Sequence, residues 1–303
     1  MGIEYSQGRP SVAFIHLTRT GGSSFRKMLR SIYGNSYHFL RDPTVAGVQT
    51  ALATYEAVEF HMVTIGIHRY LTHGEVFKEE LWDIFAGRKV FSLLRSPVDH
   101  YLSVYYHLHQ RREIDEPSFR ARGMPFSETL EQFMAWPQTY NSQIGYFLGL
   151  TRYKDGSCIE RHHLEKAKDV VRKLPVHFGL TERFAESVHL FESITGLRLP
   201  ARSIVTVNGN PDRPPLKDAP QSILDTIRSR SELEIEFYDF VQERFLEELE
   251  KAGPMPELRF AEEPTVSIEL ATAPIATAPL EGAPVVPGLW ARIKGAFAEQ
   301  SLK

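Results

Sequence analysis

The fold is decided by one stretch near the N-terminus, VAFIHLTRTGGSSFRKML at residues 12–29. Its first part, residues 12–17, is a short apolar run of the kind found in strands buried inside a parallel sheet. A small polar turn with two adjacent glycines follows, and from Ser23 onward apolar side chains recur at helical spacing. Strand, glycine turn and helix in this order present backbone N–H groups to a ligand, so the stretch predicts an anion site. An ordinary capped strand–helix turn is the alternative interpretation.

Two common nucleotide motifs are absent. The turn lacks the G-x-x-x-x-G-K-[ST] pattern of a Walker A loop, and no apolar run is followed by G-x-G-x-x-G, which removes the main support for a dinucleotide fold. A second polar pattern lies at LLRSPVDHYLSVYY, residues 93–106. Arg95 is expected at the carboxyl end of a strand over 89–94, and Ser103 about two turns into the next helix, where the two could clamp a phosphate. A buried Arg95–Asp99 ion pair with a helix-facing Ser103 is the alternative.

Strands and helices alternate along most of the chain. This order predicts an α/β fold, a parallel sheet with helices on both faces. Further strands are expected at 62–67, 176–180 and, less regularly, 203–207. Helices are expected near 44–58, 97–110, 126–136, 140–148, 161–174, 181–196 and 231–251.

Composition narrows the class of protein. With a net charge of −3 over 303 residues, the chain gives no support for bulk nucleic-acid binding. Cys158 is the single cysteine, so neither an internal disulfide nor a cysteine-based zinc site is expected, and a reducing compartment fits. No long apolar segment indicates a leader or a spanning helix, and we therefore expect a cytoplasmic protein. The histidine pairs at 107/109 and 162/163 lack carboxylates at a suitable spacing, and no metal site is expected.

The C-terminal part differs in composition. We expect a domain over 10–255, a Pro/Ala-rich flexible linker over 256–288 and a short amphipathic segment over 289–303. Four apolar residues of that segment fall on one arc of a helix too short to be stable alone. We expect it to fold only on a membrane surface or a protein partner, the alternative being a helix docked on its own domain.

Both polar motifs resemble those of sulfotransferases that use PAPS (3′-phosphoadenosine 5′-phosphosulfate), and they are most similar to the carbohydrate branch. That branch has a loop close to F-I-H-x-P-K-T-G-G-T-S and a second motif close to L-R-D-P-V-x-R-Y-L-S-x-Y-Y. Here FIH at 14–16 and TGGSS at 20–24 match the first, and most of 94–106 matches the second. Weaker echoes, including NGNPDRP at 208–214, extend the resemblance over roughly residues 10–250.

The resemblance implies a P-loop NTPase-like fold and an enzyme of bacterial type. It would transfer a sulfuryl group from PAPS to an acceptor hydroxyl, without a metal. The acceptor is expected to be a saccharide, with lipid and small-molecule alcohols left open. Residues implied to bind the cosubstrate are Arg19, Thr20, Gly21, Gly22, Ser23 and Ser24 at the 5′-phosphosulfate end and Arg95 and Ser103 at the 3′-phosphate. Arg19 would also be catalytic, by neutralising charge on the transferring group.

A general base is implied as well. The family has a Gly-His after its second strand, and His68 stands near this place, one residue out of register, as the candidate catalytic base. His61 and His73 are its competitors. The sequence departs from the family where Thr18-Arg19 replaces Pro-Lys, where Ser96 replaces Asp and where His100 replaces a frequent Arg. Two rivals stay open. One is a non-catalytic module that binds PAPS or a sulfated glycan, which the replacement of Pro-Lys favours. The other is a P-loop nucleotide kinase, against which the missing Lys-Ser/Thr pair counts.

Overall fold

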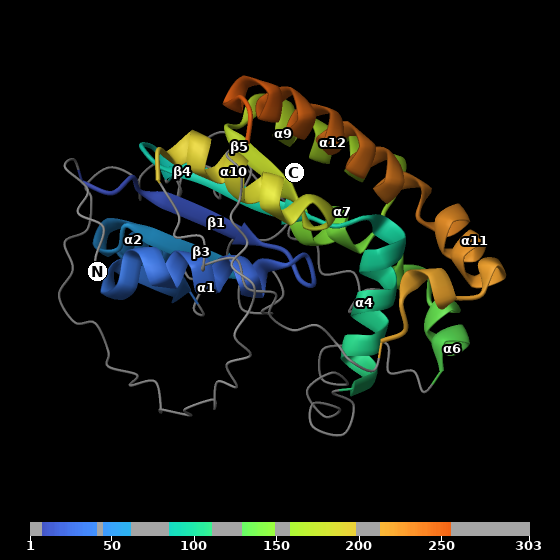
Figure 1. The fold of residues 1–303 in the computed structure, drawn as a ribbon. Coiled ribbons are helices and arrows are strands. Elements are labelled where there is room, and N and C mark those ends of the chain that lie inside the picture. The colour runs from blue at the N-terminus through green and yellow to red at the C-terminus, as the bar shows by residue number, and fades with distance from the viewer. Residues whose placement is uncertain are drawn as a thin grey trace, which may run out of the picture. The chain divides into compact units, whose positions relative to one another are not determined.

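The computed structural model is an α/β structure (Figure 1). It describes residues 8–40, 45–61, 85–110, 129–148, 158–197 and 213–255. Five parallel strands form one sheet in the order β2-β3-β1-β4-β5. Their bounds are β1 Val12–His16, β2 Tyr37–Leu40, β3 Ala57–His61, β4 Lys89–Leu94 and β5 Val176–Leu180.

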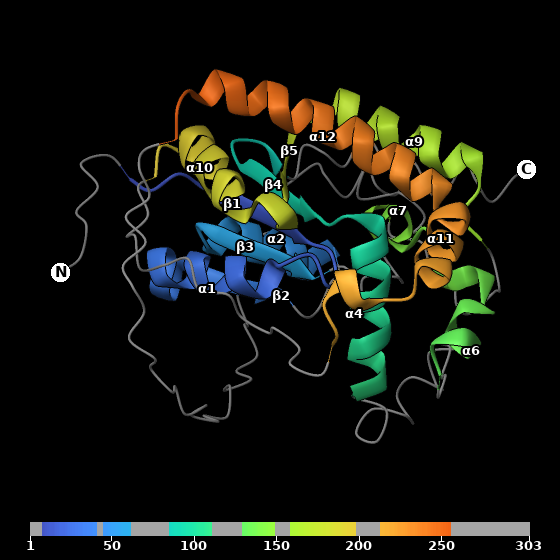
Figure 2. The same cartoon turned by 45° about the vertical axis from the view of Figure 1, so that its right-hand side comes forward.

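The helices of the described residues connect and flank these strands (Figures 1 and 2). The α-helices are α1 Gly22–Tyr33, α2 Val45–Thr54, α4 Pro97–Gln110, α6 Leu130–Met134, α7 Ser142–Phe147, α9 Arg161–Lys173, α10 Phe184–Thr195, α11 Gln221–Arg230 and α12 Glu232–Ala252. Short 3₁₀ turns are η1 Gly34–Ser36, η5 Pro137–Thr139, η6 Thr181–Arg183 and η8 Leu216–Asp218. Among the described residues, none of the helices combines the length and the apolar character that a membrane crossing requires.

Aromatic packing shows that helices cover both faces of the sheet. On one face, Phe25 of α1 stacks on Phe91 of β4 with ring centroids 5.1 Å apart and meets the edge of Phe191 of α10. Phe178 of β5 lies beside the residue that follows Phe91, so it points to the opposite face, because successive strand side chains alternate. There it contacts Phe147 of α7. The predicted parallel sheet with helices on both faces is confirmed.

Three of the expected strands are confirmed, at 12–16, 89–94 and 176–180. The remaining part of the sheet was predicted incompletely. β2 was not expected, and residues 57–61, which form β3, were assigned partly to a helix over 44–58. The reason is Glu59, a charged residue that is fully buried in the middle of β3 and interrupts the apolar pattern. The predicted strands at 62–67 and 203–207 lie outside the described residues, as do the linker and the C-terminal segment.

Among the expected helices, the long C-terminal helix is confirmed as α12, whereas α11 was not predicted. The helix expected to be capped by Thr181 begins instead at Phe184, after η6. The Thr181 hydroxyl donates to the carbonyl of Leu94 at 2.8 Å, so it joins the carboxyl ends of β5 and β4.

The sheet order creates a switch point between β1 and β4. These strands are neighbours, but the chain leaves β1 toward β2 on one side and leaves β4 toward β5 on the other. In open parallel sheets, ligands bind at the carboxyl ends of strands at such a point. Both motifs singled out in the sequence, the glycine turn after β1 and the arginine after β4, lie there.

Candidate anion-binding site

The turn between β1 and α1, residues 17–21 and called the glycine turn below, has an unusual backbone. Arg19 and Gly21 both have positive φ angles, 63° and 80°. Gly21 is the N-cap of α1, and the described structure gives this helix neither a side-chain cap nor an acidic residue in its first turn. The Gly21 carbonyl accepts from the Ser24 N–H at 3.0 Å, but no side chain caps this end of the helix, which suits an external anion.

A histidine ring lies directly under the turn. His16 ends β1, and a Cβ atom placed on Gly22 would lie 2.0 Å from its Nε2 and Cδ2 atoms. Only glycine can therefore occupy position 22 without moving the ring or the helix. The close approach of backbone and imidazole fixes where α1 begins relative to β1.

The ring is itself held by a buried carboxylate. His16 Nδ1 donates to Glu59 Oε1 at 2.7 Å, and Arg26 of α1 donates to the same oxygen from Nη2 at 2.6 Å. The Tyr37 hydroxyl donates to the other oxygen of Glu59. Although burial alone raises the pKa of Glu59, the hydrogen bonds from His16 and Arg26 lower it to about 2. Burial lowers the pKa of His16, so the imidazole is neutral and Glu59 is balanced by Arg26.

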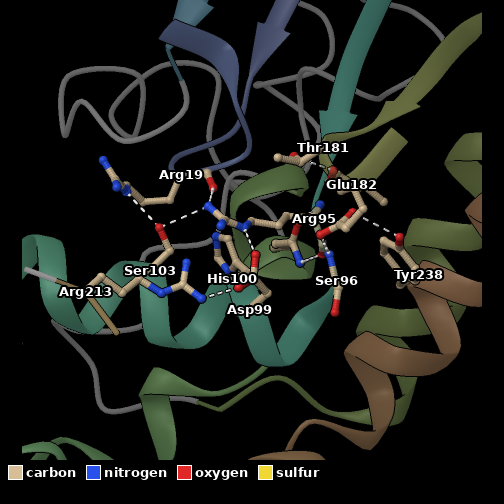
Figure 3. Close-up of polar contacts among 12 residues, drawn as sticks. Arg19, Arg95, Ser96, Asp99, His100, Ser103, Thr181, Glu182, Arg213 and Tyr238 are labelled. Atoms are coloured by element: carbon tan, nitrogen blue, oxygen red, sulfur yellow. Dashed lines mark hydrogen bonds and ion pairs between the residues drawn. The ribbon is translucent and has the colours of Figure 1, made fainter. Parts of the chain in front are cut away.

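Two arginines share one hydroxyl beside the carboxyl ends of β1 and β4 (Figure 3). Ser103 Oγ, on α4, accepts from Arg19 Nε and from Arg95 Nη1, each at 3.1 Å. Arg95 Nη1 also donates to the carbonyl of Arg19 at 3.2 Å. The glycine turn and the β4–α4 segment are thereby joined through groups that were predicted separately from the sequence.

A third arginine approaches from a later part of the chain. Asp99 accepts from Arg95 Nε at 2.5 Å through one carboxylate oxygen and from Arg213 Nη2 through the other (Figure 3). The Arg95–Asp99 pair that was the alternative interpretation is therefore present, but as one part of a larger cluster. Although burial alone raises the pKa of Asp99, the two guanidinium groups lower it.

The arginine cluster, defined as Arg19, Arg95 and Arg213 with Asp99, carries an excess of positive charge. Three guanidinium groups face one carboxylate. Burial, followed by repulsion from Arg95 and Arg213, lowers the pKa of Arg19 to about 10, which still leaves it charged at neutral pH. Within the described residues, Arg213 Nε is buried and has no hydrogen-bond partner. Desolvated, like-charged donors at one point are a fitting environment for a polyanion.

A buried polar network supports the backbone of Arg95. Gln143 of α7 accepts from the Arg95 N–H at 2.8 Å and donates to the Arg95 carbonyl at 2.7 Å. Its amide also donates to Glu234 of α12, which is 2% exposed. Glu234 in turn anchors the turn before α7, because its N–H donates to Asn141 Oδ1 at 2.9 Å. Helices α7 and α12 thus fix the strand end from which Arg95 projects.

The N-terminus of α4 is occupied by the protein's own carboxylate. Glu182, from η6 after β5, accepts from the Ser96 N–H at 2.7 Å and from the Tyr238 hydroxyl at 3.1 Å (Figure 3). Burial, together with this carboxylate, raises the pKa of Tyr238, so its hydroxyl stays protonated and donates. This helix end consequently offers less to an external anion than the end of α1.

The structure brings together the candidate residues at both motifs. Ser23 and Ser24 open α1, and the Thr20 hydroxyl is used inside the turn, where it donates to the Leu17 carbonyl at 2.9 Å. His68 and His73 lie outside the described residues, and His61 ends β3 with a side chain that is not described. Neither Arg213 nor Glu59 was singled out from the sequence. Arg213 could have been found from its place in the loop that echoes the family, but nothing marks Glu59.

Comparison with known proteins does not identify a family for this site. No protein-family model and no curated protein matches the chain. In the part of the chain that is described, no three His, Cys, Asp or Glu side chains gather as a metal site requires.

Proposed function

We propose that the protein is a PAPS-dependent sulfotransferase. The observation that carries the proposal is the convergence of Arg19, Arg95 and Ser103 between the carboxyl ends of β1 and β4, beside a helix N-terminus that lacks a cap. PAPS carries two anionic ends, a 3′-phosphate and a 5′-phosphosulfate. A site with two kinds of anion donor, backbone amides at one strand end and guanidinium groups at the other, suits such a ligand.

The described residues fit this cosubstrate on three points. The arginine cluster has more positive than negative groups, and Arg213 Nε is buried without a partner. Helix α1 begins at Gly22 without a side-chain cap or an acidic residue in its first turn, which suits a phosphate at this helix end. A P-loop NTPase-like fold, in which a glycine turn joins the first strand of a parallel sheet to its first helix, is part of the proposal.

The residues would divide the work as follows. Residues 20–24 hold the 5′-phosphate, and Arg95 and Ser103, with Arg213, hold the 3′-phosphate. Arg19 balances negative charge that develops on the oxygen bridging phosphorus and sulfur. His68 takes the proton of the acceptor hydroxyl, an effect worth about 10²- to 10⁴-fold in rate. By analogy with phosphoryl transfer, the rest of catalysis is positioning and charge stabilisation.

The acceptor is proposed to be a saccharide hydroxyl. Only the resemblance of the two motifs to the carbohydrate branch supports this choice, and lipids and small-molecule alcohols are the alternatives to test beside it. A P-loop nucleotide kinase is disfavoured because the turn continues from Gly22 into two serines, without the lysine that reaches the terminal phosphates in that class.

A non-catalytic module that binds PAPS or a sulfated glycan is the second candidate. Arg19 favours it, because this guanidinium stands where the family has a lysine and is engaged by Ser103. Incubation with radiolabelled PAPS separates the two functions. The proposal expects label to move to an acceptor or, slowly, to water, and expects His68→Ala to reduce this turnover while PAP, the desulfated product, still binds. Tight PAP binding with no release of label under any condition would favour the module.

A further inference from the structure

One side chain outside the predicted set contacts the glycine turn directly. His100, in the first turn of α4, donates from Nε2 to the carbonyl oxygen of Thr18 at 2.8 Å. The next carbonyl, that of Arg19, accepts from Arg95 at 3.2 Å. The two peptide groups that flank Arg19 are thus both held from the β4–α4 segment. This explains how a residue with a side chain keeps the left-handed φ of 63°.

The imidazole is fixed on its other side as well. The Ser142 hydroxyl of α7 donates to His100 Nδ1 at 3.3 Å, and a carboxylate oxygen of Glu234 lies 3.7 Å from the same nitrogen. The ring is fully buried, and burial lowers the pKa of His100 to about 3. It is therefore neutral at physiological pH, with its proton on Nε2. The turn is held by a donor that adds no charge beside the arginine cluster.

We propose that His100 is a positioning residue for Arg19. By holding the Thr18–Arg19 peptide, it aims the Arg19 guanidinium at an anion bound at the glycine turn. The inference rests on the proposed function only in taking that anion to be a phosphate or sulfuryl group of PAPS. A cationic side chain at this position would place a fourth positive charge next to the three arginines, and loss of the donor would free the turn.

A double-mutant cycle on PAP affinity tests this role. Because one hydrogen bond contributes about 0.5–1.5 kcal/mol, His100→Ala should weaken PAP about 2- to 12-fold. Arg19→Ala should weaken it by a comparable factor, because the Arg19 guanidinium is proposed to contact the 5′-phosphate end of the ligand. If His100 acts through Arg19, the double variant should bind PAP no more weakly than Arg19→Ala alone.

Two controls separate positioning from general stability. His100→Gln keeps a neutral N–H donor, and it should recover most of the affinity that His100→Ala loses. His189→Ala removes another buried histidine. His189 lies on α10, away from the arginine cluster, and its Nε2 is 3.1 Å from the carbonyl oxygen of Gly253. The substitution should lower the melting temperature without changing PAP affinity. Calorimetry on the full chain measures all of these variants.

The outcomes distinguish this inference from the proposed function. Losses that add in the double variant, or an equal loss in His189→Ala, would overturn the positioning role and leave the PAPS assignment intact. If PAP does not bind, the same cycle with inorganic pyrophosphate tests His100 alone, and non-additive losses there support it. A wild-type protein that binds neither anion would overturn both.

Discussion

Two strand-to-helix turns follow the carboxyl ends of the neighbouring strands β1 and β4, and they differ in the group that meets the helix N-terminus. After β1, the glycine turn leads into α1 with neither a side-chain cap nor an acidic residue in the first turn. After β4, Glu182 accepts from the Ser96 N–H, and Asp99 lies in the first turn of α4. The same local topology therefore presents two different kinds of anion donor. The first turn leaves backbone N–H groups of α1 without a side-chain cap, whereas in the second turn Glu182 accepts from the Ser96 N–H and the side chain of Arg95 is the donor.

The largest effect is expected from the support beneath the first turn. Glu59→Gln removes the negative charge that balances Arg26 and orients His16. The variant should lose about 3 kcal/mol of unfolding free energy at neutral pH. This is the low end for a broken buried ion pair, because the Arg26 side chain is partly exposed to solvent. Chemical denaturation measures this. Glu247→Gln, on the exposed side of α12, is the matched control and should change little.

The pH dependence of the same variant gives a second test. The pKa of Glu59 lies below its ordinary value of 4.5, at about 2. A lowered carboxyl pKa contributes stability that is present above pH 4.5 and is lost as the pH falls toward 2. The gap in unfolding free energy between wild type and Glu59→Gln should therefore shrink over this window. A gap that stays constant or widens would show that the charge of Glu59 does not stabilise the fold.

Gly22→Ala disrupts the start of α1, directly after the glycine turn. The added Cβ would lie 2.0 Å from the His16 ring, and overpacking of this kind costs about 1–3 kcal/mol. PAP affinity should fall with it, because α1 can no longer begin where it does. Gly8→Ala, whose added Cβ meets nothing within 4 Å, should leave both the melting temperature and the affinity unchanged. A Gly22→Ala protein with normal PAP binding would show that the turn is not a binding element.

Ser23→Asp makes the first turn resemble the second. A carboxylate in the first turn of α1 should stabilise the helix by about 0.3–1 kcal/mol. At the same place it repels an anion, and like-charge contacts cost several kcal/mol, so PAP affinity should fall sharply while stability holds. Ser23→Ala is the control for loss of the hydroxyl alone. Unchanged PAP affinity in Ser23→Asp would place the anion away from α1.

The smallest effect should come from emptying the second turn. Glu182→Ala removes the acceptor of the Ser96 N–H, and loss of a cap costs about 0.5–2 kcal/mol. PAP affinity should not fall, since in this turn the side chain of Arg95 is the proposed ligand. Glu186→Ala, which removes the partner of Arg183 on α10, is the matched control. A marked loss of affinity in Glu182→Ala alone would erase the distinction between the two turns.

The predictability of the fold follows from where its signals lie. β1, β4 and β5 are apolar runs with turn residues at their ends, so local sequence is sufficient to find them. β3 was missed because Glu59 interrupts its apolar pattern. Glu59 is stabilised by His16 and Arg26, residues 43 and 33 positions away, and such pairing leaves no local pattern. Short β2, at the edge of the sheet, was missed for lack of an apolar run.

The candidate site was predictable in its parts and not in its connections. Arg19, Arg95 and Ser103 were found from two motifs, but the sequence separates Arg19 from the other two, whereas the structure gives all three a common contact. That contact depends on the left-handed φ of Arg19 and on the hydrogen bond from His100 to the Thr18 carbonyl, and both are set by tertiary packing. Arg213 reaches Asp99 from 114 residues away and could be located only by folding the chain.

The proposed binding of a 3′-phosphate by Arg95 at the second turn is tested by calorimetry with PAP and AMP, which differ in that phosphate alone. Wild type should prefer PAP, and Arg95→Ala should remove the preference by weakening PAP more than about tenfold, as charge-assisted hydrogen bonds of 1.5–3 kcal/mol imply, while AMP is nearly unaffected. Arg172→Ala, in an exposed ion pair on α9, should change neither. Equal losses for both ligands in Arg95→Ala, or a wild type without preference, would contradict the account.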